Sequence, residues 1–174
     1  ITRSNDRLLY SLFAEYCTNI RTTSIHFSLV TQTTHHISSV SFREATPEDT
    51  DRLHTLFADP ESRPLHREDT QVTVDYINEG AIWILVRNTE VLGAGVLYKT
   101  LYQPQYVDLG MLVAAGNRKM GYGAYIVQEM TKVCHQRNLI PAIGCKANNI
   151  PFRRTLEKAG YYPYDRYMLG EIEI

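Results

Sequence analysis

The residues best suited to chemistry in this sequence form a short run, 118–123, which reads Arg-Lys-Met-Gly-Tyr-Gly. It follows an apolar run, 107–113, and opens an amphipathic run that reaches residue 137. A strand, a glycine turn and a helix start can together hold a phosphate. Glycines let backbone N–H groups approach an anion, and the helix N-terminus adds a partial positive charge. The run therefore indicates an anion site, although a glycine-rich helix entry that binds nothing would have the same pattern.

A second motif occupies residues 149–161. Asn149 begins a helical pattern that ends in Glu-Lys-Ala-Gly-Tyr, where Gly160 can terminate the helix. Together, the two motifs and the helix and strand between them resemble the cofactor-binding signatures of the GNAT family of N-acetyltransferases. The resemblance extends over roughly residues 40–170 and leaves the first forty residues outside it. It implies an α/β three-layer fold and acetyl-CoA as co-substrate.

The resemblance also implies how coenzyme A would be held. Backbone amides of residues 120–123, at a helix N-terminus, would bind the pyrophosphate, and Arg118 would help through its side chain or by shaping the loop. The pantetheine arm would lie where strands 106–113 and 139–147 splay apart, and backbone groups of residues 111–113 would pair with it as with an added strand. The residues expected to contact the cofactor are Met111, Leu112, Val113, Arg118, Lys119, Met120, Gly121, Tyr122, Gly123, Ala124, Asn149, Phe152 and Arg153.

Side chains of the second motif would complete this cofactor site. By resemblance, Asn149 would contact the pantetheine. Arg153, Arg154 or Lys119 could meet the 3′-phosphate, although a solvated helix face is the simpler interpretation of any one of them.

The implied reaction is direct transfer in a ternary complex. An amine attacks the thioester carbonyl, a backbone N–H near Val113 stabilises the oxyanion, and a base removes the ammonium proton. Leu156 stands where many family members have a tyrosine that protonates the leaving thiolate, so Tyr161, Tyr162 or Tyr164 could serve instead. Asp108 is the only carboxylate on the strand before the first motif, and a buried Asp there could act as the base. Strand alternation, however, places it on the face opposite to its apolar neighbours.

The elements that must position these residues follow residue 40 in the order β-α-α-β-β-β-α-β-α-β. This order predicts a mixed, mostly antiparallel sheet with helices on both faces. Thr46 caps the first helix, and Gly93 and Gly95 either leave room for a neighbour or mark a bulge. The predicted strands are 40–43, 81–87, 91–100, 106–113, 139–146 and 161–174, and the predicted helices begin at Thr46 and cover 70–78, 121–137 and 150–159.

The first forty residues carry no motif. A helix is predicted over residues 4–20, with Ser4 as its cap, and one or two short strands or an ordered arm over residues 22–40. We divide the chain into this appendage, 1–40, and an acetyltransferase domain, 41–174. The appendage is expected to pack on that domain; pairing with a second subunit or belonging to a neighbouring domain are the alternatives. Since the chain begins at Ile1, we interpret it as part of something longer.

Composition excludes several classes of protein. The chain has 174 residues, 44% of them hydrophobic and 21% charged, as in ordinary globular domains. A net charge of −1 argues against nucleic acid and anionic membrane as partners. The three cysteines are widely spaced and odd in number, which argues against a disulfide framework and a zinc site and suits a reducing cytoplasm. The six histidines do not have the spacing of metal ligands, so no metal site is predicted.

The sequence therefore predicts an acetyl-CoA-dependent N-acetyltransferase. Its acceptor would be a primary amine on a small molecule, an amino acid, or a peptide or protein. The acceptor pocket is expected from the loop 59–69, the helix 70–78 and the tyrosines at 98, 102, 106, 161, 162, 164 and 167. A coenzyme-A-binding sensor or docking module without catalysis is the alternative, and a homodimer is a further hypothesis.

Overall fold

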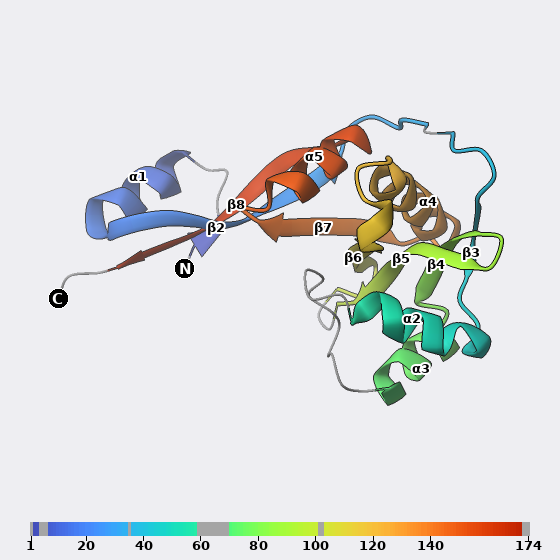
Figure 1. Ribbon diagram of the computed structural model, residues 1–174. Helices are drawn as coiled ribbons and strands as arrows, with labels where there is room; N and C mark the ends of the chain where they lie inside the picture. The colour runs from blue at the N-terminus through green and yellow to red at the C-terminus, as the bar shows by residue number, and fades with distance from the viewer. Residues whose placement is uncertain (1, 4–6, 35, 59–69, 101–102, 172–174) are drawn as a thin grey trace. The chain divides into compact units, whose positions relative to one another are not determined.

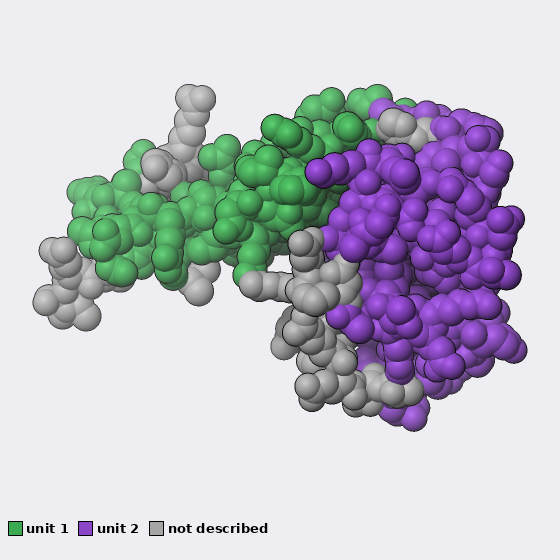
Figure 2. Space-filling view, viewed as in Figure 1, with its two compact units in different colours: residues 1–32, 142–174 green, residues 33–141 purple. Residues whose placement is uncertain are grey.

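The computed structural model describes residues 2–3, 7–34, 36–58, 70–100 and 103–171. The chain forms two compact units (Figure 2): unit 1 combines residues 1–32 with residues 142–174, and unit 2 comprises residues 33–141. Three features of the sequence-based prediction, the loop 59–69, Ser4 and Tyr102, lie outside the described residues.

Unit 2 is built on an antiparallel sheet with the strand order β6-β5-β4-β3 (Figure 1). β4 and β5 form the predicted hairpin, with Asn88 at its turn in a left-handed conformation (φ 54°). The register between β5 and β6 is unbroken from the Gly93–Val113 pair to the Lys99–Val107 pair, so β6 has no bulge against β5. The four strands are β3 (Ser41–Glu44), β4 (Ile82–Arg87), β5 (Glu90–Lys99) and β6 (Tyr106–Val113).

Helices cover both faces of this sheet. α4 (Tyr122–Gln136) packs where the two strand glycines make room for it. A Cβ at Gly95 would lie 2.4 Å from Cγ of Met130, and one at Gly93 would lie 2.7 Å from Cδ1 of Ile126. The register of the β4–β5 ladder also shifts beside Gly93, so both sequence interpretations of these glycines are confirmed. α2 (Thr50–Phe57) and α3 (Thr70–Asn78) share the opposite face, around a core that includes Leu53, Leu56, Ile77, Ile84 and Val96.

A buried carboxylate fixes the start of α2. Asp49, 1% exposed, ends a 3₁₀ turn (Pro47–Asp49) and accepts hydrogen bonds from the backbone N (2.9 Å) and hydroxyl (3.1 Å) of Thr46. The guanidinium of Arg43 donates two more, of 2.7 and 2.9 Å. The helix start predicted at Thr46 is therefore confirmed, and Arg43 is a partner that the sequence pattern did not reveal.

Unit 1 is a second antiparallel sheet, with the strand order β1-β8-β2-β7. β2 lies between β7 and β8, so a strand from the N-terminal region occupies the interior of the sheet (Figure 1). The sequence predicted one or two short strands over residues 22–40. The structure instead has one strand of 12 residues, and the described residues from 30 to 40 contain none. The strands are β1 (Thr2–Arg3), β2 (Thr18–Leu29), β7 (Ile140–Lys146), which lies mostly in unit 1, and β8 (Tyr161–Glu171).

Two helices belong to unit 1. α1 (Arg7–Tyr16) ends earlier than the predicted helix because β2 already begins at Thr18. α5 (Ile150–Lys158) buries Leu156 and is followed by Gly160 in the left-handed conformation predicted for its end (φ 91°). Residues 1–32 thus share a unit with residues 142–174, while the division of the chain at residue 40 stays a prediction.

Candidate active site

The run 118–123 forms the entry to α4 that the sequence predicted. β6 ends at Val113, a 3₁₀ turn covers Ala115–Asn117, and α4 starts at Tyr122. Gly121 is the N-cap residue and has a positive φ of 88°, which favours glycine. A Cβ added at Gly121 would meet nothing within 4 Å, so the space beside this turn is open. The first N–H groups of the helix have no partner within it and are available to an anion.

Two arginines hold this entry in shape. Arg118 Nε donates to the carbonyl of Val113 at 3.3 Å, which ties the loop back to the end of β6. Arg87, at the end of β4, donates to the hydroxyl of Tyr122 and lies over its ring at 5.7 Å from the centroid. Tyr122 is 4% exposed, so the first residue of α4 is anchored in the core. The sequence singled out Arg118, including its loop-shaping role, but gave no signal for Arg87.

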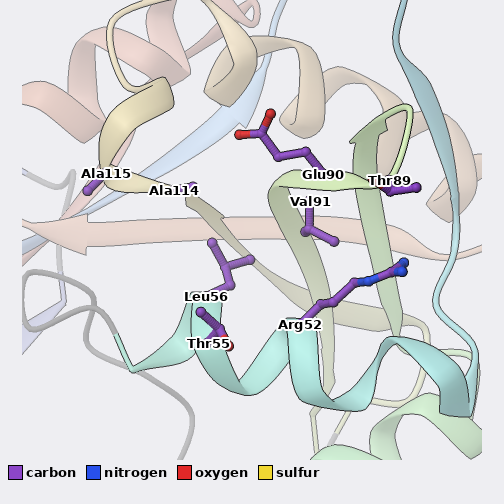
Figure 3. Close-up of a pocket in the computed structure, with 8 residues that line it drawn as sticks. All are labelled: Arg52, Thr55, Leu56, Thr89, Glu90, Val91, Ala114 and Ala115. Carbon is purple, nitrogen blue, oxygen red and sulfur yellow. The ribbon is translucent and has the colours of Figure 1, made fainter.

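A pocket of ≈ 410 Å³ adjoins the same loop within unit 2 (Figure 3). Its walls come from α2, from the turn between β4 and β5, and from the residues that follow β6. This volume is in the range of small-molecule sites. The prediction placed an acceptor pocket against the loop 59–69, helix 70–78 and the tyrosines; of these, no residue whose side chain the structure describes lines this pocket. The lining residues are Arg52, Thr55, Leu56, Thr89, Glu90, Val91, Ala114 and Ala115.

Asp108 lies on the face of β6 that strand alternation predicted. It pairs with Tyr98 of β5, on the face covered by α2 and α3, and it is exposed. The burial that would suit this carboxylate to base chemistry is therefore absent. Tyr98 packs against Gly110, 2.8 Å from the position of a Cβ there, and edge-on to Tyr76 at 5.9 Å between centroids. Burial, assisted by Tyr76 and Asp108, raises the pKa of Tyr98, so its phenol stays protonated.

In unit 1, the second motif caps and closes α5. Asn149 Oδ1 accepts a hydrogen bond from the backbone N of Phe152 at 3.2 Å. Arg153 Nη1 donates to the carbonyl of Ala147 at 3.4 Å. The Nε of Arg153 is buried and has no hydrogen-bond partner among the described residues, whereas Arg154 is exposed. A buried guanidinium N–H without a partner fits an anionic ligand.

The tyrosines that could protonate the leaving thiolate differ in how far they are exposed to solvent. Leu156 is 0% exposed, so the position that carries a tyrosine in many family members is a core position here. Tyr161 is also fully buried, whereas Tyr162 and Tyr164 are 49% and 56% exposed. Only the last two present phenols that a substrate could reach. Burial raises the pKa of the Cys145 thiol, and Arg153 opposes this only in part, so the thiol is held in its protonated form.

Unit 1 also brings together three polar side chains that the sequence did not connect. His26 of β2 pairs with Asp165 of β8, and its ring contacts that of Tyr167 at 4.9 Å between centroids. A polar alternation at positions 24, 26 and 28 could have placed His26 on one face of a strand. The strand partners, more than a hundred residues away, could not be predicted from it.

The part of the chain that the structure describes contains neither a group of metal ligands nor a membrane-spanning helix. No group of three or more His, Cys, Asp or Glu side chains there could hold a metal ion. None of the described helices is long and apolar enough to span a bilayer.

Comparison with known proteins identifies the fold. The chain matches a solved GNAT acetyltransferase from Colwellia psychrerythraea with a TM-score of 0.83 and 20% identity, over 99% of this chain and 64% of that chain. It matches a GNAT N-acetyltransferase from Sphaerobacter thermophilus with a TM-score of 0.65 and 14% identity, over 99% of this chain and 60% of that chain. It therefore spans less than two thirds of either. It also matches a putative acetyltransferase from Salmonella typhimurium that was solved with its cofactor acetyl-CoA. The TM-score is 0.61 and the identity 11%, over 79% of this chain and 96% of that chain. No curated protein sequence matches the chain.

A family model decides the assignment. Residues 39–162, well over half of the chain, match the model of the acetyltransferase (GNAT) domain. The two sequence motifs, residues 118–123 and 149–161, fall inside this range, and most of the strands and helices lie inside it or overlap it. The chain belongs to the GNAT family of acetyltransferases.

Proposed function

We propose that this protein is an acetyl-CoA-dependent N-acetyltransferase that acetylates a primary amine by direct attack in a ternary complex. The observation that carries the proposal is the open left-handed turn at Gly121, which leaves the N–H groups at the start of α4 available to a phosphate. Acetyl-CoA supplies an activated thioester carbonyl. The protein's task is to hold that donor, to position the amine and to manage the protons.

The residues of the two motifs fit such a donor. Amides of residues 120–123 would bind the pyrophosphate, and Arg118 would keep the loop in shape through its bond to the carbonyl of Val113. The unpartnered Nε of Arg153 would meet an anionic or carbonyl oxygen of coenzyme A. Asn149 uses Oδ1 as a helix cap, so we assign the contact with the pantetheine to its Nδ2. The remaining predicted contacts, with Met111, Leu112, Val113, Lys119, Gly123, Ala124 and Phe152, belong to the same proposal.

The pocket beside Ala114 supports binding of a small ligand next to this loop. Arg52 and Glu90 supply opposite charges at its lining, and Leu56 and Val91 supply apolar surface. A lining of this kind can hold a ligand that carries both charge and hydrocarbon. We therefore propose a small amine, rather than a protein, as the first class of acceptor to test.

Two measurements test this function. Titration calorimetry with acetyl-CoA measures donor binding, and thiol release from acetyl-CoA in the presence of tyramine, spermidine, L-lysine, L-glutamate or a short peptide measures transfer. We expect saturable binding, and thiol release that depends on one of these amines. Absence of acetyl-CoA binding would refute the proposal.

A second candidate function, a coenzyme-A-binding module without catalysis, is favoured by one observation. Leu156 is fully buried, so the tyrosine that many family members use as proton donor is replaced by a core residue. Tight binding of acetyl-CoA with no thiol release on any amine would support the module. A cytoplasmic location and a homodimer stay predictions; light scattering tests the latter.

A further inference from the structure

We propose that the pocket beside Ala114 receives the acceptor, and that this acceptor is a small amine which also carries a carboxylate, as an amino acid does. Arg52 would bind the carboxylate. This inference rests on the proposed N-acetyltransferase activity and names its class of substrate. All the described lining residues belong to unit 2, as does the loop 118–121 that leads into α4, so the pocket and this loop lie in one compact unit.

The guanidinium of Arg52 is the feature of the pocket that selects an anion. Arg52 lies on α2, lines the pocket and keeps 49% of its side chain exposed. Its Nη1 is 3.6 Å from Oδ1 of Asp49, which is longer than a hydrogen bond. Arg43 already donates to both oxygens of that carboxylate, at 2.7 and 2.9 Å. Among the residues that the structure describes, none accepts a hydrogen bond from the Arg52 side chain, so its N–H groups are available to a ligand carboxylate.

Glu90 provides the opposite charge, and it does so beside the chain that leaves β6. It is the first residue of β5, and its Oε1 accepts a hydrogen bond from Nδ2 of Asn117 at 3.0 Å. Asn117 ends the 3₁₀ turn that follows β6. A carboxylate held there can accept an N–H of the ligand's ammonium. The amine would then lie on the side where the chain leaves Val113, near which a backbone N–H is expected to stabilise the oxyanion.

The rest of the lining suits a short hydrocarbon chain. Arg52, Thr55 and Leu56 are spaced i, i+3 and i+4, so they share one face of α2. Figure 3 shows Leu56 rising from α2 and Val91 descending from β5 into the space between these elements. None of the described lining residues is aromatic, so an aromatic amine would find no ring to stack on. A polyamine would place a second ammonium against Arg52, whereas an amine with a carboxylate satisfies both charges.

The test uses pairs of amines that differ by one carboxylate: L-lysine with cadaverine, and L-ornithine with putrescine. Thiol release at saturating acetyl-CoA gives kcat/KM for each amine, and titration calorimetry without acetyl-CoA gives the binding of the same amines. We expect the wild-type protein to prefer the carboxylated member of each pair by at least about fivefold, as for a charge-assisted hydrogen bond at a half-exposed site.

Variants of the two charged residues assign that preference. Arg52→Gln should abolish it, Arg52→Lys should keep most of it, and Arg52→Glu should reverse it in favour of the diamines, with unchanged acetyl-CoA binding in all three. Glu90→Gln, whose amide oxygen can still accept from Asn117, should weaken both members of a pair alike, because both carry the ammonium. The matched control is Lys132→Gln, which removes an exposed cation of α4 that also has an i,i+3 acidic partner, Glu129 at 2.6 Å. It should retain the wild-type preference.

The outcomes separate this inference from the function on which it rests. If the wild-type protein acetylates and binds both members of each pair equally well, the carboxylate class is wrong and acetyl transfer still stands. If Arg52→Gln keeps the wild-type preference, Arg52 does not bind the carboxylate. A wild-type protein that binds no acetyl-CoA, or releases no thiol with any amine, would refute the transferase and the acceptor role of the pocket with it.

Discussion

The buried carboxylate of Asp49 makes a quantitative prediction about stability. Hydrogen bonds from Arg43 are the largest cause that lowers its pKa from the ordinary 3.8 to about 2, with the Thr46 backbone bond adding to the effect and burial opposing it. At about 1.4 kcal/mol per pKa unit, this lowering of the pKa corresponds to about 2 kcal/mol of folding stability. Because the folded pKa is depressed, this contribution is complete above pH 3.8 and disappears as pH falls through about 2.

Replacing Asp49 with Asn tests this value. The amide oxygen can still accept the hydrogen bond from Thr46, so the variant removes mainly the charge. We expect urea unfolding at pH 7 to show a loss of about 2 kcal/mol, which shrinks to a few tenths as the wild-type carboxyl is protonated near pH 2. Arg43 keeps 40% of its side chain exposed, so it is rehydrated and adds little further cost.

The control for Asp49→Asn is Asp51→Asn, two residues further on at an exposed position. It should change stability by less than about 0.5 kcal/mol at any pH. Two results would contradict the electrostatic reasoning: an Asp49→Asn protein as stable as the wild type at pH 7, or a loss of stability that stays the same down to pH 2.

The remaining predictions concern the site. Gly121→Val should abolish acetyl-CoA binding in calorimetry. A branched residue in this left-handed turn costs about 1–3 kcal/mol, and relief of that strain displaces the loop amides. The control Gly116→Val, also beside open space but without a positive φ, should bind acetyl-CoA normally. If Asp108 serves as the base, Asp108→Asn should lower kcat with unchanged acetyl-CoA affinity; because Asp108 is exposed, we expect near-wild-type turnover. Tyr162→Phe should reduce kcat about tenfold or more if its phenol protonates the thiolate, whereas retained activity would transfer that role to Tyr164 or to solvent.

Local signals in the sequence were sufficient to predict those helix ends and turns whose conformation depends only on residues within the same segment. The spacing of Thr46, Pro47 and Asp49 predicted a helix start because capping involves residues within one turn. The glycine at position 121 predicted a turn because few other residues adopt a positive φ there. In the same way, the end of α5 followed from Gly160.

Partners distant in the sequence could not be predicted. Arg87 at the end of β4 reaches Tyr122 at the start of α4, and no pattern near either residue specifies that contact. The long strand β2 was predicted as shorter pieces because its residues 18–23 are mostly polar; pairing with β8, not local hydrophobicity, makes them a strand. His26 went unrecognised for the same reason, since its neighbours Gly144 and Asp165 lie at the other end of the chain.

The interior position of β2 has a consequence for how the chain folds. Thr23 bonds the carbonyl of Tyr167 at 3.2 Å across a separation of 144 residues, and β1 also pairs with β8. The pairings of unit 2, in contrast, join strands that follow one another in sequence. Unit 2 can therefore assemble while synthesis continues, whereas the sheet of unit 1 must wait for β8. Until then β2 has unpaired edges, and such edges can pair with another chain.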